Sequence, residues 1–228
     1  MNAAKTPAVR AVELEKDYGD APALHPLDLV IPVGQLVALI GHNGSGKSTF
    51  LRMCTGLLTP SGGSVEIVGH AAGSMEARTA LSFLGDAPVF YDDLSVWEHL
   101  EYVARLHAVD DWEQNAADLL GHLDLYERAD DLPIRFSRGL KQKAAIAMAF
   151  IRPFDLLLVD EPFVGLDQRG RNALIELVTE HHERGATIVV ATHELSFTSR
   201  AQRMVILAGG EIVHDGEPDA GVAASHLG

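Results

Sequence analysis

The chain has 228 residues, of which 47% are hydrophobic and 22% charged, a composition that supports a packed core and excludes a disordered, collagen-like or disulfide-stapled protein. The 18 Lys and Arg residues against 32 Asp and Glu residues give a formal charge of −14, which argues against sequence-independent nucleic-acid binding because phosphates repel an acidic protein. Cys54 is the only cysteine, so no intramolecular disulfide can form, which fits a reducing compartment.

No segment of the sequence is expected to span a membrane. The longest unbroken apolar run, Ala144 to Ile151, is much shorter than the about 20 residues that a transmembrane helix needs. The first residues, MNAAKTPAVR, contain no apolar stretch typical of a secretory signal peptide. If the protein works at a membrane, we expect it to dock onto another protein there.

The chain begins with strand patterns. Leu27, Leu29 and Ile31 alternate with polar or turn-compatible residues, which predicts half-buried antiparallel strands. Leu36 to Ile40 is a continuous apolar run, which predicts a strand buried on both faces, as in a parallel sheet. An antiparallel β region is therefore expected to precede an α/β core.

A glycine-rich turn follows this strand and precedes a helix predicted from about Ser48 to Leu57. The turn fits the phosphate-binding loop G-x-x-x-x-G-K-S/T at every fixed position. Its glycines let successive backbone N–H groups point at phosphate oxygens, and the helix N-terminus adds its positive end. Lys47 would place a charge on the β- and γ-phosphates, and the Ser48 hydroxyl would bind Mg²⁺. The residues predicted to bind the nucleotide here are Gly41, His42, Asn43, Gly44, Ser45, Gly46, Lys47, Ser48 and Thr49.

A dinucleotide-binding fingerprint is excluded at the same turn. That fingerprint requires a glycine three residues after Gly46, and Thr49 stands there. The turn therefore indicates a nucleoside phosphate without saying what the nucleotide is used for.

The middle of the chain has a helical pattern from about Ser95 to Leu123. Ser95 and Glu98 form a capping box, and apolar residues from Leu100 to Leu106 follow at helical spacing. We therefore expect a helical insertion at about residues 90–145.

An apolar strand, Leu156 to Val159, ends in the adjacent carboxylates Asp160 and Glu161. Neighbouring strand residues point to opposite sides, so one carboxylate can face a metal while the next faces a reacting water. Asp160 fits the Mg²⁺ role, and Glu161 fits a general base that takes a proton from the attacking water.

The remaining patterns complete an α/β fold. A helical spacing over Gln168 to Arg184 and an apolar strand over Thr187 to Ala191 follow the acidic residues. Two further runs, from Met204 and from Glu211, flank Gly209-Gly210 as in a hairpin. The sequence thus predicts a single α/β domain over residues 1–228, with a P-loop NTPase core of mostly parallel strands and flanking helices, an N-terminal antiparallel β subdomain and an inserted helical subdomain.

At this point the chain resembles the ATP-binding subunits of ABC transporters. The segment from Phe136 to Lys143 resembles the signature of that family, L-S-G-G-Q, in a variant found among exporters. Ser137 and Gly139 hold the matching serine and second glycine, whereas Arg138 and Leu140 depart from the commonest form.

Three further residues match the family in order along the chain. Tyr18 is similar to the aromatic residue that stacks on adenine, a role for which a ring offers a flat apolar face. Asp167, in Gly165-Leu166-Asp167, resembles the D-loop, which links the sites of two subunits in this family. His193 resembles the switch histidine that contacts the γ-phosphate.

One position departs from the family. ABC proteins usually carry a glutamine in a pattern like L-P-Q-E-P at the start of the helical insertion, and here Asp86 stands at that position in Leu84-Gly85-Asp86-Ala87-Pro88. A carboxylate is a hard oxygen ligand, so we expect Asp86 still to sense Mg²⁺.

The resemblance implies a mechanism and partners. Two copies, or this chain and a similar one, would bind ATP and Mg²⁺ head to tail, with Ser137 and Gly139 of one copy covering the γ-phosphate held by the other. ATP would close the dimer and hydrolysis would release it. Separate transmembrane permease subunits would receive the motion, which places the protein on the cytoplasmic face of the membrane, with export favoured.

Two other functions stay open at this point. A soluble ABC-type ATPase in cofactor assembly or nucleic-acid maintenance is one, although the chain has no coiled coil and is strongly acidic. The other is a nucleotide-gated binding module without turnover, which the substitution at Asp86 would suit but the presence of Lys47, Glu161 and His193 would not.

Overall fold

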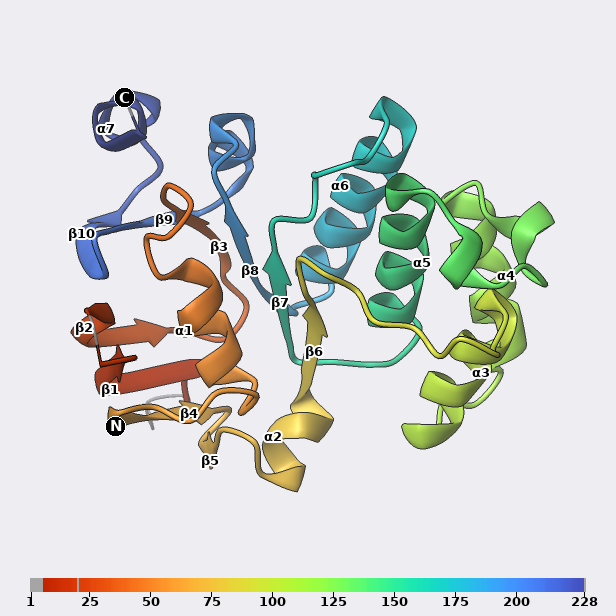
Figure 1. The fold of residues 1–228 in the computed structure, drawn as a ribbon, viewed down its shortest axis with the longest axis horizontal. Coiled ribbons are helices and arrows are strands. Elements are labelled where there is room, and N and C mark those ends of the chain that lie inside the picture. Colours follow the sequence, from red (N-terminus) through yellow and green to blue (C-terminus); the bar gives the residue numbers. More distant parts are fainter. Residues whose placement is uncertain (1–5, 20, 228) are drawn as a thin grey trace. The chain divides into compact units, whose positions relative to one another are not determined.

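The computed structural model describes residues 6–19 and 21–227, which form two compact units (Figure 1). The first unit draws on residues 6–83, 154–161 and 184–227, and the second on Leu84–Pro153 and Pro162–Glu183. Among the described residues, no helix is long and apolar enough to cross a membrane.

The first unit contains a four-stranded antiparallel sheet in the order β2-β1-β4-β5. Its strands are β1 (Val9–Asp17), β2 (Pro22–Ile31), β4 (Gly62–Ile67) and β5 (His70–Ala71). Leu27, Leu29 and Ile31 are buried while their neighbours along β2 are exposed. The antiparallel, half-buried strands that this alternation predicted are confirmed.

A six-stranded sheet, in the order β10-β9-β3-β8-β7-β6, forms the rest of the framework of this unit. Its strands are β3 (Leu36–Ile40), β6 (Leu81–Leu84), β7 (Leu156–Asp160), β8 (Thr187–Thr192), β9 (Arg203–Ala208) and β10 (Glu211–Gly216). β3 runs parallel to β8 and β9, and β7 runs parallel to β8. Every residue of β3, β7 and β8 is buried, as the continuous apolar runs predicted.

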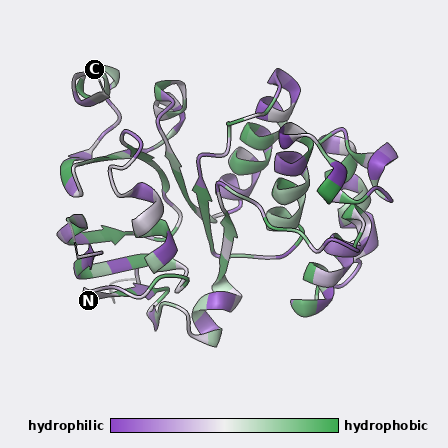
Figure 2. Cartoon of the chain, viewed as in Figure 1, coloured by the Kyte–Doolittle hydropathy of each residue, from purple (hydrophilic) through white to green (hydrophobic). Residues whose placement is uncertain are grey.

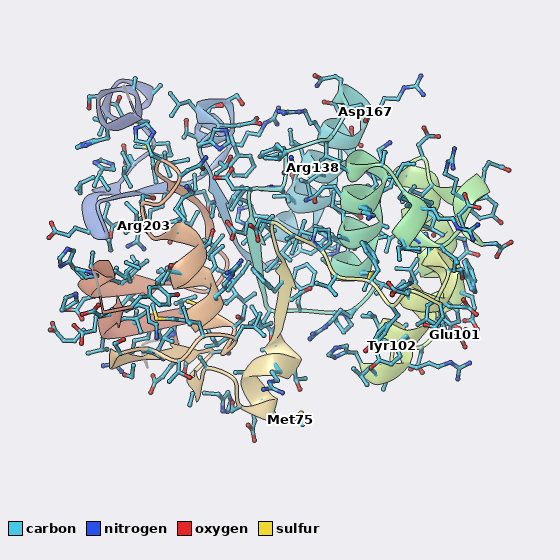
Figure 3. The ribbon with its side chains drawn as sticks, viewed as in Figure 1. Met75, Glu101, Tyr102, Arg138, Asp167 and Arg203 are labelled. Atoms are coloured by element: carbon cyan, nitrogen blue, oxygen red, sulfur yellow. The ribbon has the colours of Figure 1, made fainter. Side chains whose placement is uncertain are left out.

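The hairpin predicted at Gly209-Gly210 joins β9 to β10. Both glycines have positive φ, +57° and +82°, in the left-handed region where a side chain is disfavoured. Arg203, labelled in Figure 3, binds Asp215 of β10 through two N–H groups at 2.6 and 2.7 Å and donates to the Val30 carbonyl at 2.8 Å. This side chain therefore ties the six-stranded sheet to β2 of the other sheet.

Helix α1 (Lys47–Cys54) fills the space beside both sheets. Phe50, Leu51, Met53 and Cys54 are fully buried in one core with apolar residues of β1, β2, β3 and β7. Figure 2 shows apolar residues concentrated on the strands of this unit. Burial of a side chain such as Phe50 or Leu51 contributes roughly 1.5–3 kcal/mol, so this core fixes where α1 begins.

Three short helices complete the first unit. They are α2 (Met75–Ala80), the 3₁₀ helix η3 (Leu195–Arg200) and α7 (Ala220–Leu227).

The second unit is helical. Its helices are α3 (Val96–Leu106), α4 (Trp112–His122), α5 (Arg138–Phe150) and α6 (Gln168–Glu183), with the 3₁₀ turns η1 (Tyr126–Arg128) and η2 (Pro133–Arg135). The predicted capping box is present, because Glu98 N donates to Ser95 Oγ at 3.2 Å and Ser95 N donates to a Glu98 carboxylate oxygen at 2.7 Å. The hydrogen bond from Ser95 N first, and a side-chain hydrogen bond of Ser95 second, lower the pKa of the Glu98 carboxyl.

The helical stretch predicted over residues 95–123 is divided into α3 and α4. Ala108 and Asp111 have φ of +50° and +51°, a left-handed backbone that ends one helix and allows the next to start in a new direction. The second unit contains the predicted insertion and also α6. This helix begins at Gln168, as the pattern over Gln168 to Arg184 predicted.

Candidate nucleotide-binding site

The glycine-rich turn joins β3 to α1 as its sequence predicted. It occupies Gly41 to Gly46, and α1 begins at Lys47. Gly44 and Gly46 have φ of +81° and +106°, which side chains rarely adopt. Ser45 N donates to the His42 carbonyl at 3.1 Å, which closes the turn. The remaining backbone N–H groups at the start of α1 are those that a phosphate would meet.

Packing requires glycine at two positions of this turn. A Cβ atom on Gly41 would overlap the Leu207 carbonyl oxygen and Ser45 Oγ. On Gly46 it would lie 2.6 Å from Leu24 Cδ1 and 2.9 Å from the Ala23 carbonyl. The turn is therefore held against β2 and β9 by close backbone contact and is preorganised for a ligand.

Ser45 supplies an observation that points to a ligand. Its Oγ is buried and has no hydrogen-bond partner among the described residues. Buried hydroxyl groups are normally satisfied, so an unsatisfied one inside a phosphate-type turn fits a bound oxyanion. Around it, His42 and Asn43 are exposed and Ser48 and Thr49 are half-buried at the first turn of α1.

Lys47 is the most constrained side chain of the site. It is only 4% exposed, and its Nζ donates to the carbonyls of Gly41 and His42 at 2.6 and 3.1 Å. The same nitrogen lies 3.3 Å from Glu161 Oε1. Three oxygen atoms therefore hold the ammonium group at the mouth of the turn, and phosphate oxygens would compete with them for it.

The acidic residues lie at the end of β7, but by a different geometry from the one predicted. Asp160 is the last residue of the strand and is fully buried. Glu161 lies beyond the strand with φ of +45°, and its N–H donates to the Ala191 carbonyl at 2.8 Å. A left-handed residue, and not simple strand alternation, therefore directs the Glu161 carboxylate toward Lys47.

His193 completes a chain of three charged or ionisable groups. Its Nδ1 lies 2.8 Å from Glu161 Oε2, and its backbone N–H donates to the same oxygen at 3.4 Å. The ring is half exposed. Lys47 at the start of α1, Glu161 after β7 and His193 after β8 thus meet within one unit. The sequence motifs did not predict that Lys47 and Glu161 form a pair, nor that the Glu161 carboxylate points toward the lysine.

Tyr18 lies after β1 with an exposed ring. The side chain is 62% exposed, and Lys16 Nζ lies 5.2 Å from the ring centroid. The Asp17 carboxylate accepts a hydrogen bond from Gly19 N at 2.6 Å, which fixes the turn that carries the ring. The ring is exposed, and its stacking on a base stays a prediction.

Replacing Tyr18 with Ala tests this role. Loss of one base–aromatic stack should weaken ATP binding by about 1–3 kcal/mol, while binding of inorganic triphosphate should stay unchanged. Titration calorimetry with both ligands measures the difference, and Tyr18→Phe, which keeps the ring, is the matched control. Equal losses for ATP and triphosphate would refute base stacking.

The other predicted site residues belong to the second unit. Ser137 caps α5, since its Oγ accepts a hydrogen bond from Leu140 N at 3.4 Å. Gly139 lies in the first turn of α5, and Asp167 immediately precedes α6. Asp86 follows β6. Within one chain, the structure gathers the phosphate loop, the acidic residues and His193 in the first unit, and Ser137, Gly139 and Asp167 in the second.

Comparison with known proteins identifies the relatives of this chain. The ABC transporter family matches residues 24–164. The ABC-type transporter ATP-binding protein EcsA of Bacillus subtilis is 35% identical, over 88% of this chain and 83% of its own length. A dimeric ATP-binding cassette, MJ0796, in a post-hydrolysis state with ADP and Pi, is 26% identical with a TM-score of 0.84, over 92% of this chain and 99% of that one. Relatives at about 32% identity carry names for macrolide export and for arginine transport.

Proposed function

The chain belongs to the ABC transporter family of ATP-binding proteins, which are ATPases, and we propose that it hydrolyses ATP at Lys47, Glu161 and His193 to drive transport through separate transmembrane subunits. The observation that carries the proposal is the contact chain Lys47–Glu161–His193, which joins a phosphate-binding lysine to a carboxylate able to act as a base. A binding module without turnover would not require that base beside the lysine.

The contacts indicate how binding and chemistry are linked. Glu161 Oε1 lies 3.3 Å from Lys47 Nζ and balances its charge. Phosphate oxygens of ATP would draw the ammonium group away, which leaves the Glu161 carboxylate to accept a proton from the attacking water. His193, whose Nδ1 contacts Glu161, would hold that carboxylate and contact the γ-phosphate.

Mg²⁺ fits the oxygen atoms of this site. The Ser48 hydroxyl and the Asp160 carboxylate are hard oxygen donors in the first unit, and Mg²⁺ is usually held by one or two protein oxygens together with substrate phosphates. When bound, the ion would neutralise charge on the β- and γ-phosphates. Lys47, Glu161 and His193 keep the roles given above.

We propose that Asp86 senses Mg²⁺ through water, and this role can be tested directly. We expect Asp86→Ala to lower the ATPase rate, with and without a membrane partner, by about tenfold, the lower range for losing an outer ligand of a metal site. Asp86→Gln, which restores the residue usual in the family, is the matched control and should keep most of the activity. Unchanged rates in Asp86→Ala would remove Asp86 from the site.

Membership of this family also indicates which partner chains to expect. We propose that two copies, or one copy and a similar chain, close head to tail on ATP, with Ser137 and Gly139 of each copy covering the nucleotide of the other. The dimeric cassette among the structural relatives supports this arrangement. Docking to transmembrane subunits would place the protein on the cytoplasmic face of the membrane. We propose export as the direction, on the exporter-like signature at Ser137 to Leu140.

One experiment separates transport from the alternative. The tagged chain, expressed in its own cells, should be recovered from detergent-extracted membranes with a transmembrane protein, and the complex should release phosphate from ATP. Recovery only from the soluble fraction, with ATPase activity intact, would favour a soluble ABC-type ATPase. Inside-out vesicles that contain the complex test the direction of transport. An exporter would move its substrate from the medium into these vesicles when ATP is added outside.

A further inference from the structure

Lys143 is a buried charged residue that the proposed reaction does not use. It lies on α5, two turns after Ser137, and its side chain is 6% exposed. Burying an ammonium group without a partner is costly, so its surroundings show what it does. Its Nζ lies 3.6 Å from Asp167 Oδ1, and both residues belong to the second unit.

The start of α6 holds the same oxygen atom of Asp167. Its Oδ1 accepts a hydrogen bond from Gly170 N at 2.7 Å. That hydrogen bond first, and the charge of Lys143 second, lower the pKa of the Asp167 carboxyl, so it is ionised at neutral pH. A Cβ atom on Gly170 would lie 3.0 Å from both Lys143 Cε and Asp167 Oδ1, so the absence of a side chain there lets the lysine reach the carboxylate.

Three more close contacts join the start of α5 to the segment of residues 162–170. A Cβ atom on Gly139 would lie 2.6 Å from the Gly165 carbonyl oxygen, and one on Gly165 would lie 3.2 Å from Arg138 Cγ. Gln142 Nε2 donates to the Pro162 carbonyl at 3.2 Å. Figure 3 shows Arg138 and Asp167 near neighbouring ends of α5 and α6. The first two turns of α5 and residues 162–170 therefore form one packed piece.

We propose that Lys143 is a positioning residue that holds Asp167 against the start of α5, so that Ser137, Gly139 and Asp167 are presented to a second copy as one rigid surface. The inference rests on the proposed head-to-tail dimer. The Asp167 side chain is 62% exposed, and its contacts with the Gly170 N–H and with Lys143 hold the carboxylate in place. Without Lys143, the Gly165–Asp167 turn would sample other conformations, and each dimer would have to reorder it on closing.

The test uses the full chain carrying Glu161→Gln, in which ATP should accumulate the closed dimer. Sedimentation velocity with ATP and Mg²⁺ gives the dimer dissociation constant, and nucleotide titration at low protein concentration gives the monomer's ATP affinity. Adding Lys143→Met, which keeps the aliphatic stem, should weaken the dimer by about tenfold, the size of a typical coupling between contacting residues, and leave the monomer's ATP affinity unchanged. Lys143→Arg should restore the dimer, and Lys141→Met, on the same helix, should leave it as in the background.

The outcomes are distinguishable. If Lys143→Met dimerises as tightly as the background, or Lys143→Arg is as weak as Lys143→Met, the positioning role is wrong while the proposed function stands. If the Glu161→Gln background itself stays monomeric with ATP, the proposed function fails and the inference fails with it. If circular dichroism shows that Lys143→Met is unfolded, Lys143→Gln takes its place. That variant also removes the charge of the lysine and should weaken the dimer to the same degree.

Discussion

Replacing Glu161 with Gln is expected to lower the rate constant for ATP hydrolysis by about 100- to 10,000-fold, the usual contribution of a general base. An amide cannot take the proton of the attacking water, yet it has nearly the shape of the carboxylate. Because Glu161 Oε1 lies 3.3 Å from Lys47 Nζ, the variant also removes a partner that would compete with phosphate for the lysine. We therefore expect ATP to bind at least as tightly as it does to the natural protein.

Phosphate release under single-turnover conditions measures the rate, and equilibrium binding of ATP measures the affinity. Glu211→Gln, which neutralises an exposed carboxylate of β10, is the control for the loss of one negative charge. Hydrolysis by Glu161→Gln at the natural rate would show that another group is the base. A large loss of ATP affinity would instead show that Glu161 serves binding.

Replacing Lys47 with Met is expected to cost about 2–5 kcal/mol of ATP binding free energy, the range for removing one member of a buried charge pair. The lysine already contacts Gly41 O, His42 O and Glu161, so part of its gain from phosphate is offset by contacts that it gives up. We expect the loss near the lower end of the range, roughly 30-fold in the dissociation constant. Titration calorimetry measures it, with Lys141→Met as the control.

The Lys47–Glu161 contact can be measured apart from nucleotide binding. Lys47→Met alone leaves the nearly buried Glu161 carboxylate without its cation, whereas the double variant with Glu161→Gln removes both charges. Urea unfolding of the four proteins should therefore give a coupling free energy of about 0.5–3 kcal/mol. A coupling of zero would mean that the pair does not form in solution.

Local patterns in the sequence predicted much of the fold and the site residues of the first unit. The phosphate loop, the strand that ends at Asp160 and the hairpin at Gly209-Gly210 each depend on residues that are neighbours in the chain. Their conformations follow from glycine flexibility and from the burial of continuous apolar runs. The same holds for the Ser95 capping box.

Contacts between distant segments could not be predicted in this way. At Glu161 the left-handed backbone occurs together with a hydrogen bond from its N–H to the Ala191 carbonyl of the neighbouring strand, and a glutamate does not signal that conformation in the sequence. The division between α3 and α4 falls on Ala108 and Asp111, and alanine is the strongest helix former, so the residue type at 108 does not predict a left-handed backbone. For Lys143 a signal did exist, because it directly precedes the long apolar run from Ala144, and a lysine that is buried there needs a partner in the fold.

The burial of Cys54 has a practical consequence. It is the only thiol of the chain, it is completely buried in α1, and burial raises its pKa, so very little reactive thiolate is present at neutral pH. A single cysteine introduced at an exposed position such as Tyr126 should therefore take up a maleimide dye alone. Energy transfer between copies labelled with donor and acceptor would then report association of subunits in real time, with the natural cysteine left in place.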